Sequence, residues 1–329
     1  MRAIYKKDYP YMYARVSAKK AKLYNEKDYN RFLKMEVNEI SRKMEEGSYS
    51  REINELGSEM SGAALIEKAL NQNLENTLQH LLKISSEDAK PIIEAYNRRF
   101  DLMQYKKLLR WKEGSQKQEI NTLVDLERFD LTIEEVGEKT FEELMETISF
   151  ENSLIDYQKE IEACSSEEEL EICLDKAYSK EMRKVASNTK SKEFKEYVKT
   201  EQFYHDLILA LRLMKYGVEK EKIRVKMVSE NSNELEKIIK CESFDEAMDK
   251  AQKITGAEGE NLEKLEHSIE QRRLQEALST LYREPLGLSS VIGYMVAKTI
   301  EVDNLRMIAR AKETGIQNRE TIKNNLVLN

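Results

Sequence analysis

The sequence is poor in residues that interrupt helices. Its 329 residues include only 3 prolines and 11 glycines. Proline lacks the backbone donor that a helix interior needs and glycine destabilises helices, so their scarcity permits long continuous helices. Apolar residues recur at helical spacing, as in residues 66–81. The best strand candidate, residues 124–133, is interpreted as a linker. The chain is therefore predicted to be all-α.

Long apolar runs and a secretory signal pattern are also missing. No stretch reaches the roughly 18 consecutive apolar residues of a membrane span, so we expect none. Cys164, Cys173 and Cys241 are odd in number and lack metal-ligand spacing, which is typical of reduced thiols in a cytosolic protein. The formal net charge of −7 argues against a general nucleic-acid binder. We therefore expect a cytoplasmic protein without nucleic-acid partners.

Residue patterns that carry catalysis are missing as well. There is no phosphate-binding loop of the form GxxxxGK[ST], and no serine lies in a GxSxG elbow. His80, His205 and His267 lie far apart in the chain, and none has a His or Cys partner one helical turn away. We predict no catalytic, cofactor-binding or metal-binding residues, no cofactor and no small-molecule substrate. The chain is expected not to be an enzyme.

What the sequence does contain is an internal repeat. Residues 299–315 (TIEVDNLRMIARAKETG) have weaker copies at residues 98–114 and 200–217. When one arginine of each copy is aligned, the apolar positions agree and a glycine stop follows each arginine. The aligned residues are Arg110, Arg212 and Arg310, followed by Gly114, Gly217 and Gly315. Such repetition predicts three tandem homologous helical bundles. The predicted repeats are residues 1–122, 123–225 and 226–329.

Each predicted repeat is expected to enclose a core of its own, because the apolar columns recur within each third of the chain. Leu305 lies on a face predicted to be buried. A second family of helices precedes the repeated one, at residues 66–85, 170–186 and 262–278. Its members align glutamates and, one turn later, further polar residues. These columns are Glu67, Glu171 and Glu263, then Asn71, Asp175 and His267.

Basic side chains supply the candidate interaction residues. The aligned arginines either form ion pairs with neighbouring helices of the same repeat, or surround a common axis and face a partner. The basic face of the first helix is either solvated or contacts an acidic partner or lipid head groups. Polar contacts at an interface would weaken with salt. The candidate partner-interface residues are Lys19, Lys20, Lys22, Arg110, Arg212, Arg306 and Arg310.

These residues carry a resemblance to a known family. Residues 284–322 (EPLGLSSVIGYMVAKTIEVDNLRMIARAKETGIQNRETI) resemble the C-terminal pattern of the C subunits of rotary A-type and V-type ATPases, which are homologous to the d subunit of eukaryotic V-ATPases. Residues 66–112 and the Tyr-Ala-Arg at 13–15 also fit, so the resemblance spans essentially the whole chain. The middle repeat departs most, with Phe203 in the column of Glu301 and Asp206 in the column of Asn304.

The resemblance implies a funnel of three helical bundles around a pseudo-threefold axis. Such a funnel sits on the cytoplasmic face of the membrane rotor ring and receives the tip of the central rotor shaft, which is built from D-type and F-type subunits. The implied role is non-catalytic: it couples ATP hydrolysis or synthesis to proton or sodium transport. The protein would be peripheral to the cell membrane. The alternative from the residues alone is a helical-repeat adaptor for proteins or peptides, unrelated to rotary ATPases.

Overall fold

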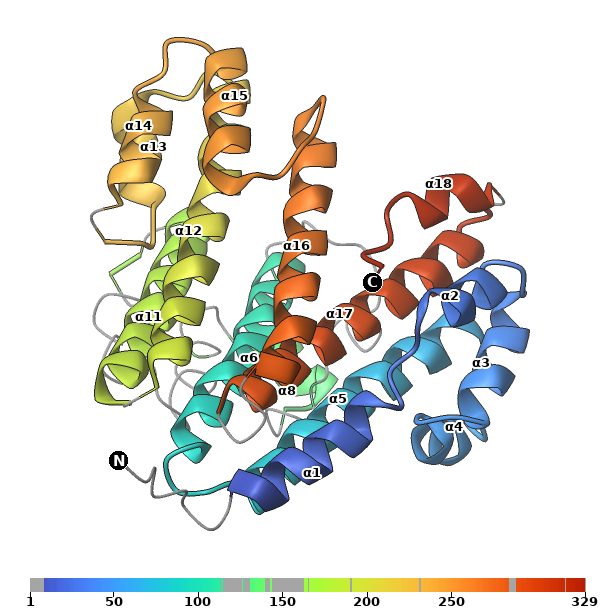
Figure 1. Cartoon of the computed structure of the whole chain (residues 1–329). Coiled ribbons are helices and arrows are strands. Elements are labelled where there is room, and N and C mark those ends of the chain that lie inside the picture. Colours follow the sequence, from blue (N-terminus) through green and yellow to red (C-terminus); the bar gives the residue numbers. More distant parts are fainter. Residues whose placement is uncertain are drawn as a thin grey trace, which may run out of the picture. The chain divides into compact units, whose positions relative to one another are not determined.

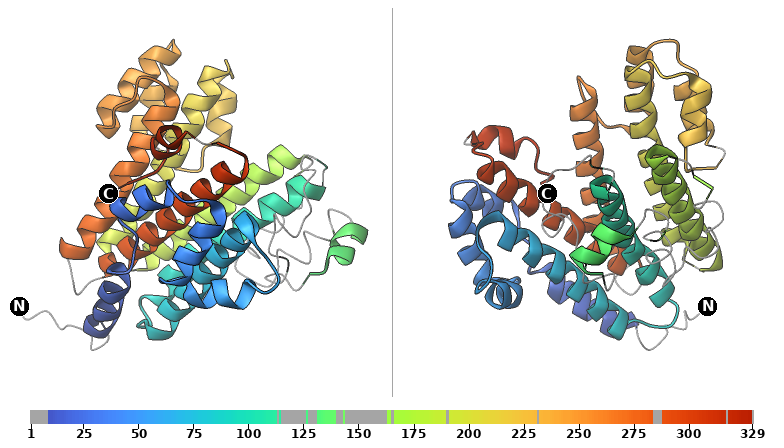
Figure 2. Two further views of the ribbon diagram at one scale, coloured as in Figure 1. Left: turned by 90° about the vertical axis from the view of Figure 1, so that its right-hand side faces the viewer. Right: turned by 180° about the vertical axis from the view of Figure 1, so that it is seen from behind.

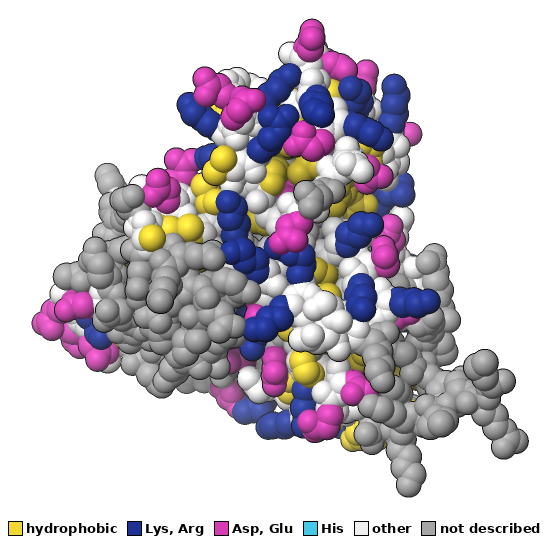
Figure 3. Space-filling view, turned by 90° about the vertical axis from the view of Figure 1, so that its left-hand side faces the viewer, with side chains coloured by type: hydrophobic (Ala, Val, Ile, Leu, Met, Phe, Trp, Pro, Cys, Tyr) yellow, Lys and Arg dark blue, Asp and Glu magenta, His cyan; other side chains and the backbone are white. Residues whose placement is uncertain are grey.

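The structure is a computed structural model. It describes residues 9–112, 114, 126, 131–139, 143, 163–164, 166–189, 191–230, 232–283, 288–316 and 318–328. These residues form α-helices and contain no β-strand, so the all-α prediction is confirmed for this part of the chain. The linker predicted at residues 124–133 falls mostly outside it. Lys and Arg mix with Asp and Glu over the face shown in Figure 3, as expected for solvated helix faces.

The chain divides into two compact units. The first comprises Met1–Ile93 and Met248–Asn329, and the second comprises Glu94–Ala247. Among the described residues, eight helices lie entirely within the first unit, and Figure 1 labels them. Their bounds are α1 (Tyr9–Lys20), α2 (Glu26–Phe32), α3 (Val37–Glu45), α4 (Ser50–Leu56), α5 (Gly62–Ile84), α16 (Leu262–Arg283), α17 (Leu288–Glu313) and α18 (Arg319–Lys323).

Helix α17 is the centre of the first unit. Every residue from Leu288 to Val302 is buried, and beyond it burial recurs at Asn304, Leu305, Ile308 and Ala309. The first half of the helix therefore has neighbours on all sides, and the second half has one solvated face. Helices α16, α5, α1 and α3 pack against α17, and Figure 2 shows α5 and α17 side by side in both views. Leu305 is fully buried, as predicted.

The repeated glycines end helices in the same way. Gly114, Gly217 and Gly315 have φ angles of 77°, 73° and 80°, a region that side chains with a Cβ disfavour. At two of these stops the residue after the glycine donates to a carbonyl five residues back, 3.0 Å for Val218 to Leu213 and 2.9 Å for Ile316 to Ala311. This geometry is the Schellman motif. The shared stop signal found in the sequence is confirmed.

The second unit is built around α11 and α12. Its described residues include several hydrophobic clusters. Leu102, Leu170, Leu174 and Ala177 form one, with Cys164 and Tyr178 packed against it. Another consists of Ala210, Ile223, Leu235 and Ile239. Helices α6 and α15 each extend across a boundary between the units. The helix bounds are α6 (Lys90–Lys112), α8 (Ile133–Glu138), α11 (Glu167–Asn188), α12 (Lys192–Lys215), α13 (Lys220–Lys226), α14 (Asn233–Ile239) and α15 (Phe244–Thr255).

The expectation that each predicted repeat encloses its own core is wrong. In the first unit, α17 from the third predicted repeat packs against α5 from the first. In the second unit, Leu102 from the first repeat shares a core with Leu170 and Leu174 from the second. Helical periodicity identifies the buried face of a helix but not the helix that covers it, and this is why the sequence misled. The repeat boundaries themselves remain a prediction.

No helix in the described part of the chain is long and apolar enough to cross a membrane. All three cysteines are free thiols, as expected. Cys164 and Cys173 lie side by side at the start of α11.

Leu305→Ala should lower the free energy of unfolding by about 2–5 kcal/mol, because it removes buried methyl groups and leaves a cavity. Met307, on the same helix, is 39% exposed, so Met307→Ala serves as the matched control and should change stability far less. Denaturant unfolding followed by circular dichroism measures both. Equal stability of the two variants would show that the packing around Leu305 is not as described.

Candidate functional site

Two charged side chains are buried on one face of α17. Lys298 and Glu301 are separated by one helical turn, and Lys298 Nζ lies 2.8 Å from Glu301 Oε1. Their side chains are 4% and 3% exposed. A buried charge is tolerated only when it is paired and its remaining hydrogen-bonding capacity is used. The partners of this pair therefore determine what can pack on α17.

Those partners come from two connections in the first 50 residues. The Tyr49 hydroxyl donates to Glu301 Oε1 at 2.7 Å and accepts from Lys298 Nζ at 2.8 Å. The backbone N–H of Tyr24 donates to Glu301 Oε2 at 2.6 Å. Burial, and then the nearby Glu301 carboxylate, raise the pKa of Tyr49 well above its usual value, so the hydroxyl stays protonated as a donor. The network fixes the small module α2–α4 to the central helix.

The predicted arginines of the third repeat lie where α17 meets α5. Arg310 forms a bidentate ion pair with Glu67. Arg306 donates to Asn71 Oδ1 and to Asp303 Oδ1, each at 2.7 Å, and its Nε lies 3.6 Å from Glu67. The Arg306 side chain is 18% exposed, whereas that of Arg310 is 51% exposed. Arg310 thus keeps half of its surface available to solvent.

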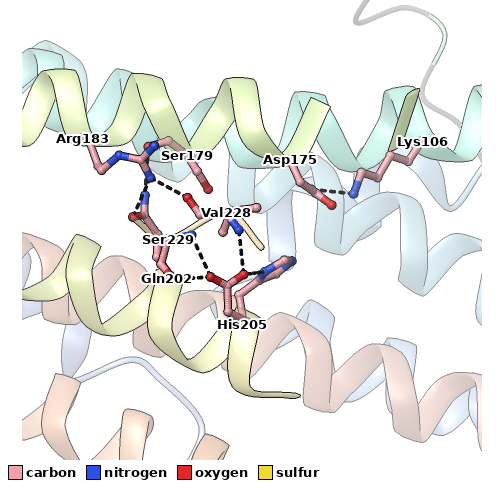
Figure 4. A network of polar contacts seen from close by, with 9 residues as sticks. Lys106, Asp175, Ser179, Arg183, Gln202, His205, Val228 and Ser229 are labelled. Atoms are coloured by element: carbon pink, nitrogen blue, oxygen red, sulfur yellow. Dashed lines mark hydrogen bonds and ion pairs between the residues drawn. The ribbon is translucent and has the colours of Figure 1, made fainter. Parts of the chain in front are cut away.

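The second unit repeats this arrangement. Arg110 on α6 donates from Nε and Nη2 to the two carboxylate oxygens of Glu171 on α11, at 2.6 and 2.9 Å. One turn away, Lys106 Nζ lies 2.6 Å from Asp175 (Figure 4). The aligned columns therefore meet in the same way in both units. Arg110 and Arg310 each pair with a neighbouring helix, but that helix belongs to another predicted repeat. Arg212 lies on the exposed side of α12.

Lys19 and Lys20 lie in the last turn of α1, and Lys22 follows it. Lys19 and Lys20 are half-buried and Lys22 is exposed. Partial burial lowers the pKa of Lys19, and repulsion from Lys298, Lys22 and Arg15 lowers it further. Lys19 and Lys22 thus lie in a region where positive charge accumulates.

Comparison with known proteins shows which family the chain belongs to. The model of the ATP synthase (C/AC39) subunit family matches residues 12–324. The chain belongs to this family. The C subunit of the A-type ATP synthase of Methanosarcina acetivorans is 30% identical over 98% of this chain and 93% of its own length. The corresponding protein of Methanococcoides burtonii is 30% identical over 98% and 94%. That of Haloquadratum walsbyi is 28% identical over 94% and 96%. The resemblance inferred from the motifs is confirmed.

This C/AC39 family member also shows what the middle-repeat departure does. Asp206 is fully buried and accepts from the backbone N–H groups of Val228 and Ser229, at 2.9 and 2.7 Å. The aligned Asn304 accepts from Val327 N at 2.9 Å and donates to Val327 O at 2.7 Å. Asp206 thus anchors the segment after α13, and Asn304 anchors the segment after α18. Each of these short helices follows a glycine stop. Replacing an amide by a carboxylate keeps this role, because two backbone donors suit two carboxylate oxygens.

Sequence reasoning did not find the network around Arg183, which lies beside Asp206. Arg183 Nη1 donates to Gln202 Oε1 at 3.0 Å and to Val228 O at 2.7 Å, and Nη2 contacts Glu230 at 2.9 Å. Its signal in the sequence was absent, because these partners lie far apart along the chain. Among the described residues, no group of three or more His, Cys, Asp or Glu side chains lies close enough to hold a metal ion.

Lys298→Met in this C/AC39 family member should cost about 3–5 kcal/mol of stability, because the Glu301 carboxylate is left buried without its counter-charge. Adding Glu301→Gln should recover part of the loss, because the remaining group is neutral. Chemical denaturation of the two variants measures this, with the exposed Lys34→Met as control. A double variant less stable than Lys298→Met would contradict the buried-pair interpretation.

Proposed function

We propose that this chain is the non-catalytic socket of a rotary ATP synthase, between the central rotor shaft and the membrane rotor ring. The observation that carries the proposal is the family match over nearly the whole chain, with relatives named as C subunits of A-type ATP synthases. The partners are then the D-type and F-type shaft subunits and the ring. The protein acts in the cytoplasm, peripheral to the membrane. The match argues against an adaptor unrelated to rotary ATPases.

The internal packing of each unit suits a part that transmits torque. Helices from different predicted repeats are joined by bidentate or clustered ion pairs, Arg110 with Glu171 and Arg310 with Glu67. Bidentate pairs fix relative orientation as well as distance. In our proposal, three homologous helical repeats, at residues 1–122, 123–225 and 226–329, surround a pseudo-threefold axis and share cores with one another. Divergence between the repeats lets one protein contact two partners of unlike symmetry.

The seven basic candidates remain our proposal for the partner surfaces. Arg110 and Arg310 are 43% and 51% exposed despite their ion pairs. Exposed charge of this kind adds attraction that weakens with ionic strength. Arg306 is largely covered by Glu67, Asn71 and Asp303 and is therefore the weakest candidate on α17.

A reconstituted motor that lacks this chain should keep ATP hydrolysis by its soluble head but lose ATP-driven ion transport, because the shaft no longer drives the ring. Hydrolysis and ion uptake into vesicles are measured in parallel, and adding back the purified chain should restore uptake. Ion uptake that stays coupled to hydrolysis without the chain would overturn the proposal. If only an Arg306→Glu, Arg310→Glu variant stays coupled, the choice of residues fails and the socket stands.

A charge exchange separates the internal role of Arg110 from a role toward a partner. Arg110→Glu should lower stability by about 0.2–1 kcal/mol, the range for a partly exposed pair. Adding Glu171→Arg restores the pair with reversed polarity and should restore stability. If Arg110 also faces a partner, coupled ion uptake stays reduced in the exchanged variant. Full recovery of both stability and uptake would assign Arg110 to the fold alone.

A further inference from the structure

Beyond the proposed function, one surface of the first unit concentrates positive charge from two helices. Helix α1 meets the C-terminal end of α5, where Ser85 Oγ lies 3.6 Å from Met12 Sδ. The pKa of His80, on α5, is lowered by burial and then by three nearby cations. These are Arg15 and Lys19 of α1 and Lys83 of α5. Lys22, which follows α1, acts in the same way on Lys19. We call Arg15, Lys19, Lys22, His80 and Lys83 the α1–α5 basic cluster.

One acidic group that acts on this cluster, Glu52, is directed inward. Glu52 is the carboxylate that raises the pKa of Lys19 against the other influences. Its side chain is only 3% exposed, and it accepts from Asn73 at 2.9 Å and from Asn76 at 3.0 Å. Burial and then three basic side chains lower the pKa of His80, and no carboxylate is among the causes. Arg15, Lys22 and Lys83 are exposed, so the cluster itself presents positive charge to solvent. Of the acids that follow α5, Glu87 is paired with Lys90 at 2.6 Å.

An exposed aromatic side chain lies on the same helix. Tyr11 is 54% exposed, and the Arg15 guanidinium carbon lies 5.9 Å from the centre of its ring. Tyrosine beside lysine and arginine is the combination found at membrane interfaces, where the ring enters the head-group layer and the charges meet phosphates. Lysine predominates over arginine, and its compact charge suits phosphates without the bidentate geometry that carboxylates favour.

We propose that the α1–α5 basic cluster, with Tyr11, binds the head groups of anionic phospholipids at the membrane surface. The contact is electrostatic and superficial, because the described helices include no membrane span. It is independent of the contact with the rotor ring, since it needs only this chain and a lipid surface.

The test uses the full-length chain and sedimentation with two kinds of vesicles, pure phosphatidylcholine and phosphatidylcholine with phosphatidylglycerol. Binding is expected to the anionic vesicles only, and it should weaken as salt rises. Arg15→Gln and Lys83→Gln should each weaken it about fivefold, the effect of roughly one juxtamembrane charge. Lys34→Gln removes an exposed lysine outside the cluster and should leave binding unchanged.

Histidine resonances provide a second readout, since the chain has only 3 histidines. Bicelles containing phosphatidylglycerol should raise the pKa of His80, because phosphates favour the imidazolium. Absence of binding, equal binding to neutral vesicles, or equal loss in Lys34→Gln would each overturn the proposal. Binding of polyglutamate without vesicle binding would assign the cluster to an acidic protein instead. None of these outcomes depends on coupling in the motor, so the proposed function is tested separately.

Discussion

The first unit depends on the cost of burying Lys298 and Glu301 within one turn of α17. Neither charge is tolerated in a core without the other, and the pair also needs the Tyr49 hydroxyl and the Tyr24 N–H. Helix α17 can therefore be buried only when the segment from 24 to 49 is in place. Helices α2, α3 and α4 are too short to form a core alone, so the same contacts give them a fixed position. The packing of α17 and the hydrogen bonding of its buried charges therefore depend on one another.

Charge also sets the order of helices around α17. Its first half, Leu288–Val302, is buried on all sides, and its arginines lie in the second half, where one face reaches solvent. There they pair with Glu67 of α5, as Arg110 pairs with Glu171 of α11. A salt bridge at a surface contributes little stability, but it selects one register between two helices. The repeated columns thus specify which helices meet and how they are aligned.

The sequence predicted the helices and where several of them end. It did not predict which helices pack together, and these failures have a common cause. Scarce proline and glycine predicted helices, and the glycine stops predicted their ends at Gly217 and Gly315. The columns of Arg310 and Glu67 were visible in the sequence, but their pairing across predicted repeats was not. Periodicity reports how one helix is buried and carries no information on its partner. The Arg183 network and the Lys298–Glu301 pair were missed because a charged residue in a helix is expected to face solvent until its partners are known.

The net charge of the whole chain does not describe the charge of each part of its surface. The value of −7 predicts weak attraction to polyanions on average. Charges on a protein surface are screened beyond about 8 Å at physiological salt, so a binding surface responds to its own neighbourhood rather than to the sum. The lysines at 19, 20 and 22 were evident from the sequence, whereas His80 and Lys83 join them only because α1 meets the end of α5. The fold thereby brings basic side chains of two helices together on an acidic protein, while Glu52 beside them is directed inward.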